Sequence, residues 1–227
     1  MKKLIISLIA MSLSISSIAQ STVTVRDFET WSALALNYKL NKKVTLGLEE
    51  QLRLKDNSSV IDQYFTEVTG KYKLINGLSP GLGLRYIREN DNVGKVQGYE
   101  NHLRWNFDLG YKHSIKKIAL KYRLRYQSKS ELGVDAAELD NTVRLKIGLG
   151  YNIKDWKLDP WVSGEIFNTV GSESDLKKYR LTLKTEYKTK NIGSFGAFYR
   201  LEQQLNKANP KTTNIAGFKY TYALERK

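Results

Sequence analysis

The sequence contains no cysteine, which excludes both a disulfide framework and a thiolate metal site. Histidine is nearly absent too, and two isolated residues, His102 and His113, make a poor zinc site. Only 3 prolines interrupt 227 residues, whereas glycine and tyrosine number 16 and 14. This balance is typical of pleated sheet joined by tight turns. We therefore expect an all-β chain with neither a metal site nor a cofactor.

Long hydrophobic runs are also missing beyond residue 20, although a membrane-spanning helix needs about 20 apolar residues. The first twenty residues differ from the rest. Two lysines precede an apolar run at residues 4–13, and residues 17–19 read Ser-Ile-Ala, which fits the small-x-small cleavage rule. We interpret residues 1–19 as a signal peptide and residues 20–227 as a single β-barrel domain. An uncleaved membrane anchor is the alternative, whereas a lipoprotein anchor would need a cysteine at the cut.

Alternation of apolar and polar residues dominates the remainder. Segment 99–111 is the clearest, because apart from Asn101 one face is aromatic or aliphatic, and apart from Gly110 the other is polar. The same period of two recurs at residues 118–127, 143–151, 179–187 and 195–202, and more weakly at 34–40, 44–54, 64–72, 82–86, 157–170 and 218–224. These segments predict eleven strands, but single-chain bacterial barrels have an even number. We expect any miscount to lie in the long stretch 22–40.

Alternation alone also fits a soluble sandwich, in which the charged face would be the exterior. Three features favour a membrane barrel. The strands are long, as expected when a tilted membrane strand needs about 9–11 residues; tyrosine or tryptophan flanks several apolar faces; and the opposite face is strongly charged while the whole chain has low hydropathy. The connections also alternate between shorter and longer, as they do in bacterial barrels. The predicted fold is an antiparallel transmembrane β-barrel of about 10–12 strands. We expect short periplasmic turns, longer outer loops and a place in the bacterial outer membrane.

The sequence also resembles a known family over most of its length after the signal peptide. The resemblance lies in four stretches: Asp27-Phe28-Glu29-Thr30-Trp31, Leu48-Glu49-Glu50-Gln51-Leu52-Arg53, Asp62-Gln63-Tyr64-Phe65 and Tyr122-Arg123-Leu124-Arg125-Tyr126-Gln127. The family is an uncharacterised one of bacterial outer-membrane β-barrel proteins, labelled only as a domain of unknown function. The resemblance implies an outer-membrane barrel and implies no activity or catalytic residue.

The polar face is expected to line the lumen, and its charged residues are the candidate site: Arg104, Lys121, Arg123, Arg125, Arg144, Lys146, Arg180, Lys184, Glu100, Glu186 and Glu202. Charges inside a narrow barrel must either pair across strands or sit in water. Two interpretations follow, a structural barrel plugged by an Arg/Glu ladder and a narrow, water-filled basic pore. The chain carries 37 Lys and Arg against 23 Asp and Glu. Small anionic solutes, outer-membrane lipid and lipopolysaccharide are therefore the expected partners, rather than nucleic acid, which an exported chain seldom meets.

An enzyme of the barrel class, a hydrolase acting on lipid or peptide, is the alternative function. The Gly-x-Ser-x-Gly motif is absent, and His102 is expected to point inward between Glu100 and Arg104, as a lumen hydrogen-bonding group. The glycines Gly81 and Gly83 do not form a phosphate loop, because they lie inside a strand with no helix after them. No catalytic residue is predicted.

Overall fold

The computed structural model describes residues 24–75, 77–92, 94, 97–154, 156–171, 174–189 and 192–225. The predicted signal peptide, and parts of five predicted connections, lie outside these residues. Within them the chain forms strands that close into one barrel, and no helix there is long and apolar enough to cross a membrane. The strands are β1 (Val25–Lys39), β2 (Val44–Lys55), β3 (Val60–Tyr72), β4 (Leu78–Asp91), β5 (Gly98–Ile115), β6 (Ile118–Glu131), β7 (Asp140–Tyr151), β8 (Trp161–Thr169), β9 (Leu176–Lys188), β10 (Ser194–Gln204) and β11 (Lys211–Glu225).

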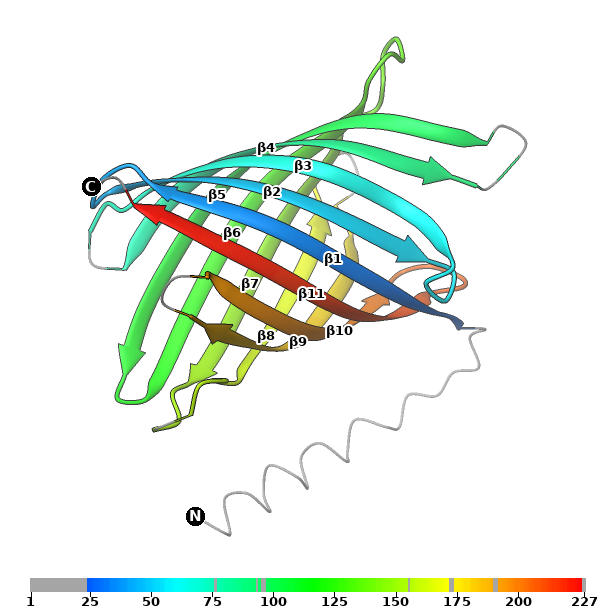
Figure 1. Ribbon diagram of the computed structural model, residues 1–227. Coiled ribbons are helices and arrows are strands. Elements are labelled where there is room, and N and C mark those ends of the chain that lie inside the picture. Colours follow the sequence, from blue (N-terminus) through cyan, green and yellow to red (C-terminus); the bar gives the residue numbers. More distant parts are fainter. Residues whose placement is uncertain are drawn as a thin grey trace.

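The all-β barrel and the count of eleven strands are confirmed over the part of the chain that the structure describes. The expected miscount at residues 22–40 was wrong for the part that the structure describes, because residues 24–40 hold a single strand, β1, of 15 residues. Consecutive strands pair antiparallel, but β1 and β11 close the barrel in parallel, from Val25↔Lys211 to Lys39↔Glu225. Figure 1 shows the two strands side by side, β1 in blue and β11 in red. An odd number of strands in an up-and-down barrel leaves one pair parallel, so the barrel is mixed rather than purely antiparallel.

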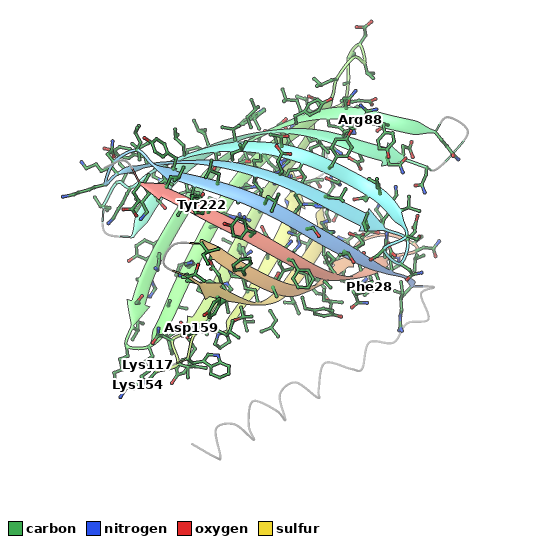
Figure 2. The ribbon with its side chains drawn as sticks, viewed as in Figure 1. Phe28, Arg88, Lys117, Lys154, Asp159 and Tyr222 are labelled. Atoms are coloured by element: carbon green, nitrogen blue, oxygen red, sulfur yellow. The ribbon has the colours of Figure 1, made fainter. Side chains whose placement is uncertain are left out.

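The two ends of the barrel differ. We call the end with connections 40–43, 73–77, 116–117, 152–160 and 189–193 the turn end, and the end with connections 56–59, 92–97, 132–139, 170–175 and 205–210 the loop end. The longest connection, 152–160, lies at the turn end, together with the labelled Lys117, Lys154 and Asp159 in Figure 2. Among its described residues, the N–H of Asn152 donates to the Lys117 carbonyl at 2.9 Å, and the Asp159 carboxylate accepts the N–H of Ile153 at 3.0 Å.

The strands place their apolar face outside and their charged face inside. Leu34, Leu82 and Phe218, on β1, β4 and β11, are 62–64% exposed on the outer wall. Arg85, which alternates with Leu82 and Leu84 on β4, is 7% exposed inside the barrel. A soluble sandwich would have the opposite arrangement, with the charged side chains on its exterior. The structure therefore decides which of the two faces encloses the core.

Aromatic side chains flank the outer apolar band at both ends. Tyr72, Tyr111, Tyr122, Tyr151, Tyr187 and Tyr222 lie on the outer face toward the turn end, and Tyr64, Tyr86, Tyr99, Tyr126 and Tyr199 lie on it toward the loop end. Three loop-end hairpins repeat one hydrogen bond, in which a tyrosine hydroxyl donates to an asparagine fifteen residues later. The pairs are Tyr86–Asn101 at 2.7 Å, Tyr126–Asn141 at 3.1 Å and Tyr199–Asn214 at 2.7 Å. Each bond joins the two strands of its hairpin just before the loop.

Candidate functional site: a basic cavity inside the barrel

The barrel encloses a cavity of about 900 Å³ to which every strand contributes side chains. Its lining contains sixteen Lys and Arg but only five Asp and Glu. The lining residues come from both ends of the strands: Asp140 and Lys177 lie at the loop end, and Lys71 and Lys112 lie at the turn end. The cavity is therefore long, water-accessible and strongly positive.

Eight of the eleven residues in the predicted site line this cavity: Arg104, Lys121, Arg123, Arg125, Arg144, Lys146, Arg180 and Lys184. The other three, Glu100, Glu186 and Glu202, lie on the inward faces of β5, β9 and β10, outside the cavity lining. Glu202 binds Lys178 at 2.5 Å and also pairs with Arg180. Glu100 lies 3.2 Å from Nε2 of His102.

One row of charges crosses five neighbouring strands. In the strand register, Arg123, Lys146, Glu165, Arg180 and Glu202 lie directly opposite one another in turn. Directly opposed charges of opposite sign stabilise a sheet, whereas like charges destabilise it. The like pair Arg123–Lys146 is therefore compensated by the carboxylate next in the row.

Glu165 is the centre of this row, and its side chain is only 1% exposed. Its carboxylate lies 2.6 Å from Arg123, 2.8 Å from Arg144, 3.7 Å from Arg180 and 4.0 Å from Lys146. Four cations thus share one buried carboxylate. The sequence analysis missed this residue, because Gly164 and Phe167 interrupt the apolar–polar alternation of β8.

Two further carboxylates hold the remaining buried arginines. Glu67 binds Arg85 at 2.8 Å and Arg104 at 3.2 Å. Asp108 accepts two hydrogen bonds from Arg125, at 2.5 and 2.7 Å, in the fork geometry that makes arginine–carboxylate pairs strong. These pairs form the Arg/carboxylate ladder that the plugged-barrel interpretation requires.

Arginines and aromatic rings also stack inside the barrel. We call Trp31, Arg53, Phe65, Arg85, Phe167, Arg180 and Arg200 the arginine–aromatic layer. The Arg53 guanidinium lies 3.7 Å above the Trp31 ring, and the Arg85 guanidinium lies 3.4 Å above Phe65. Arg200 lies 5.0 Å from Trp31. Within the described ranges, Arg53 and Arg200 have no carboxylate partner. Besides its aromatic contact, Arg53 donates a hydrogen bond to the Gln51 side chain at 2.8 Å, and Arg200 also lies 3.9 Å from the centre of the Phe198 ring.

The arginine–aromatic layer was absent from the sequence-based site, although part of its signal was available. Trp31, Phe65 and Phe167 are aromatic residues at inward positions of their strands, out of phase with Leu34, Tyr64 and Ile166 on the outer face. Trp31, Arg53 and Phe65 also come from three of the four stretches that carry the family resemblance. Their convergence depends on the stagger between strands, which alternation does not encode.

A second group of cations lies toward the turn end. We call Lys71, Lys112, Lys121 and Lys184, together with Trp161, the lysine chamber. None of these four lysines forms an ion pair with any residue that the structure places. The lining of the cavity also includes small residues: Ala35, Gly47, Thr69, Ser79, Gly81, Gly110 and Gly148. Among the described residues, the positive charge of the cavity is thus paired with carboxylates near its middle, whereas the lysines near the turn end have no such partners.

The two histidines that a hydrolase could use lie on opposite faces of the barrel wall. His102 lies inside the barrel beside Glu89 and Glu100, whereas His113 lies outside and stacks on Tyr122 with ring centroids 5.8 Å apart. Over the ranges that the structure covers, no group of three His, Cys, Asp or Glu side chains could hold a metal ion. Among the described residues, neither histidine therefore belongs to an assembled metal site.

Comparison with known proteins identifies one family. A family model described as "Protein of unknown function (DUF2490)" matches residues 28–214, a range that begins in β1 and ends in β11. No curated protein and no solved structure matches the chain at a significant level. The expected membership of an uncharacterised family is confirmed: the chain belongs to the DUF2490 family of proteins of unknown function.

Proposed function

We propose that the protein is a bacterial outer-membrane β-barrel whose basic interior forms a narrow, anion-selective pore. The observation that carries this proposal is the combination of an apolar outer wall with a cationic cavity in which Lys71, Lys121 and Lys184 have no carboxylate partner among the described residues. The signal peptide predicted at residues 1–19 agrees with export.

The outer wall supports membrane embedding. Leucine, valine, isoleucine and aromatic side chains cover it from β1 to β11, and exposing so continuous an apolar surface to water is unfavourable. Belts of tyrosine at both ends match the interfacial girdles of outer-membrane barrels. A lipid environment satisfies both features, because the hydrocarbon contacts the band while the phenol hydroxyls reach the headgroups.

The lysines at the turn end favour lipid phosphates as a partner of the protein. Eight exposed lysines surround the turn end: Lys42, Lys43, Lys73, Lys116, Lys117, Lys154, Lys157 and Lys188. The described residues of the loop-end connections carry the acidic Asp56, Asp135, Glu138 and Asp175 and a single lysine, Lys207. Basic residues at a membrane surface attract anionic headgroups. Because the turn end is the expected periplasmic end, we propose that its lysines contact the phosphates of outer-membrane phospholipid in the inner leaflet.

The interior supports anion preference. Uncompensated positive charge within low-dielectric walls focuses the field and concentrates anions. With sixteen cationic and five acidic lining residues, the cavity keeps a large positive excess even after every carboxylate has paired. Part of this positive charge belongs to the lysines at the turn end that have no carboxylate partner among the described residues. It therefore lies at one mouth of the barrel, where a solute would enter.

The test is the reversal potential across a salt gradient in a planar bilayer that contains the refolded protein. We expect anion preference that weakens at high salt, because the screening length falls from about 10 Å at 0.1 M to about 3 Å at 1 M. Replacing Lys71, Lys121 and Lys184 together with glutamine should lower the preference. Lys207→Gln, in the exposed loop-end connection 205–210, is the control and should leave it unchanged. Cation preference in the unmodified protein would refute the proposal.

A closed structural barrel is the second candidate, and the arginine–aromatic layer favours it. Phe65 is 1% and Trp31 3% exposed, so aromatic rings and the arginines stacked on them occupy much of the interior away from the turn end. A complete absence of conductance, with the protein correctly inserted, would support this candidate over the pore.

A further inference from the structure

The position of Trp161 in the lysine chamber is set by its neighbours on β7 and β9. It is the first residue of β8, directly opposite Gly150 on β7 and Lys184 on β9. Its ring lies along the β7 wall where two glycines leave room: a Cβ atom would come within 2.4 Å of the ring at Gly148 and within 2.3 Å at Gly150. The carbonyl of Pro160 accepts the N–H of Tyr151 at 3.1 Å and anchors the chain just before the indole.

Two lysines from different strands meet at this indole. The ammonium of Lys121, on β6, lies 4.5 Å from the ring centroid, and that of Lys184, on β9, lies 5.7 Å from it. Lys121 is directly opposite Gly148, so it reaches Trp161 across a position without a side chain. The indole thus gathers two ammonium groups on one apolar surface.

The positive charge of the lysines around Trp161 is not balanced by nearby carboxylates among the described residues. Lys112 lies directly opposite Lys121 on β5, and like charges in that relation destabilise a sheet unless an anion screens them. Glu186, two residues after Lys184 on the same face of β9, is the acidic residue nearest along that strand, and it forms no ion pair with either lysine. Three lysines and one glutamate leave an excess of positive charge around an accessible apolar ring.

We propose that Lys121 and Lys184, assisted by Lys112, bind the phosphate group of a small phosphorylated solute, whose organic part contacts Trp161. A phosphate dianion matches ammonium groups that approach from several directions, because lysine acts as a point charge toward phosphate oxygens. The adjacent indole then favours an aromatic or apolar ester over inorganic phosphate. The inference rests on the proposed function, since it names the class of anion that the basic cavity takes.

The test is isothermal titration of the refolded, detergent-solubilised barrel with phenyl phosphate, which requires no conduction. We expect saturable binding that is weaker for inorganic phosphate and absent for phenol. Lys121→Gln combined with Lys184→Gln should lower the affinity by about tenfold or more, because charge-assisted hydrogen bonds are lost. Lys207→Gln is the control and should bind as the unmodified protein does. A second readout is tryptophan fluorescence, whose change on binding should disappear in Trp161→Phe.

Heat modifiability on a gel shows whether each variant is folded. If the double variant does not fold, the Trp161→Phe fluorescence and the phenol comparison decide. The inference is overturned if phenyl phosphate does not bind, or if it binds equally to the folded double variant. Binding without conductance would refute the pore and leave this site standing, whereas anion conductance without saturable binding would refute this site alone.

Discussion

The indole of Trp161 occupies the space that a side chain at Gly148 would need, since a Cβ atom there would lie 2.4 Å from Cζ2 of the ring. Gly148→Ala should therefore push the indole off the β7 wall. Overpacking of this kind typically costs about 1–3 kcal/mol. We expect a lower urea midpoint and an altered tryptophan emission spectrum. Gly164→Ala is the matched control, because its Cβ would meet Leu181 at an ordinary 3.8 Å; equal effects of the two substitutions would contradict the packing described.

Glu165→Gln should both destabilise the barrel and raise its anion preference. The substitution leaves Arg123, Arg144, Arg180 and Lys146 around a neutral amide, and removing one partner of a buried ion pair typically costs about 3–5 kcal/mol. Unfolding in urea measures the first effect, and the reversal potential measures the second. Glu225→Gln, which breaks only the exposed pair with Lys39, should change the unfolding free energy by no more than about 1 kcal/mol.

Two substitutions on β6 test which face meets lipid. Leu124 is 49% exposed on the outer wall, and an arginine there should cost about 2–4 kcal/mol if the position faces the middle of a bilayer. Lys121→Leu, on the inward face of the same strand, breaks no ion pair and should assemble normally. Insertion into lipid vesicles, followed by heat modifiability on a gel, shows which of the two variants assembles less well. A greater loss of assembly for Lys121→Leu would show that the outer wall does not face lipid.

Trp31→Ala should widen the interior. The Trp31 ring lies under the guanidinium of Arg53 and near those of Arg180 and Arg200, so its loss removes the surface on which these arginines stack. In a pore, we expect higher single-channel conductance. Trp105→Ala is the control, because that indole is 46% exposed on the outer wall and its loss should leave conductance unchanged. Unchanged conductance in Trp31→Ala would place the constriction elsewhere.

Much of the wall could be predicted from alternation alone. In segment 99–111, Trp105, Phe107 and Leu109 lie outside, whereas Arg104 and Asp108 lie inside and are buried. This succeeds because successive side chains of a strand point to opposite faces, so one well-patterned segment orients the whole strand. Which face is enclosed depends on how the sheet closes, and that required the structure.

The site was harder to predict, because it depends on contacts between strands distant in the sequence. Arg123 and Glu165 are separated by 42 positions and meet only through the register of β6, β7 and β8. A shift of register by one residue would turn the facing side chains to the other wall. The start of β8 was also uncertain from sequence. Pro160 cannot donate to the ladder, so the strand begins at Trp161, and this position places the indole over its two glycines.

The parallel seam between β1 and β11 also has a topological consequence. Because β1 begins at the loop end and β11 finishes at the turn end, Val25 and Glu225 stand at opposite mouths of the barrel. An epitope placed just before Val25 and one placed just after Glu225 would then be reached by antibody from opposite sides of the proposed membrane. Insertion of such a chain has to translocate one of its ends, whereas an even-stranded barrel leaves both ends in the compartment from which it assembled.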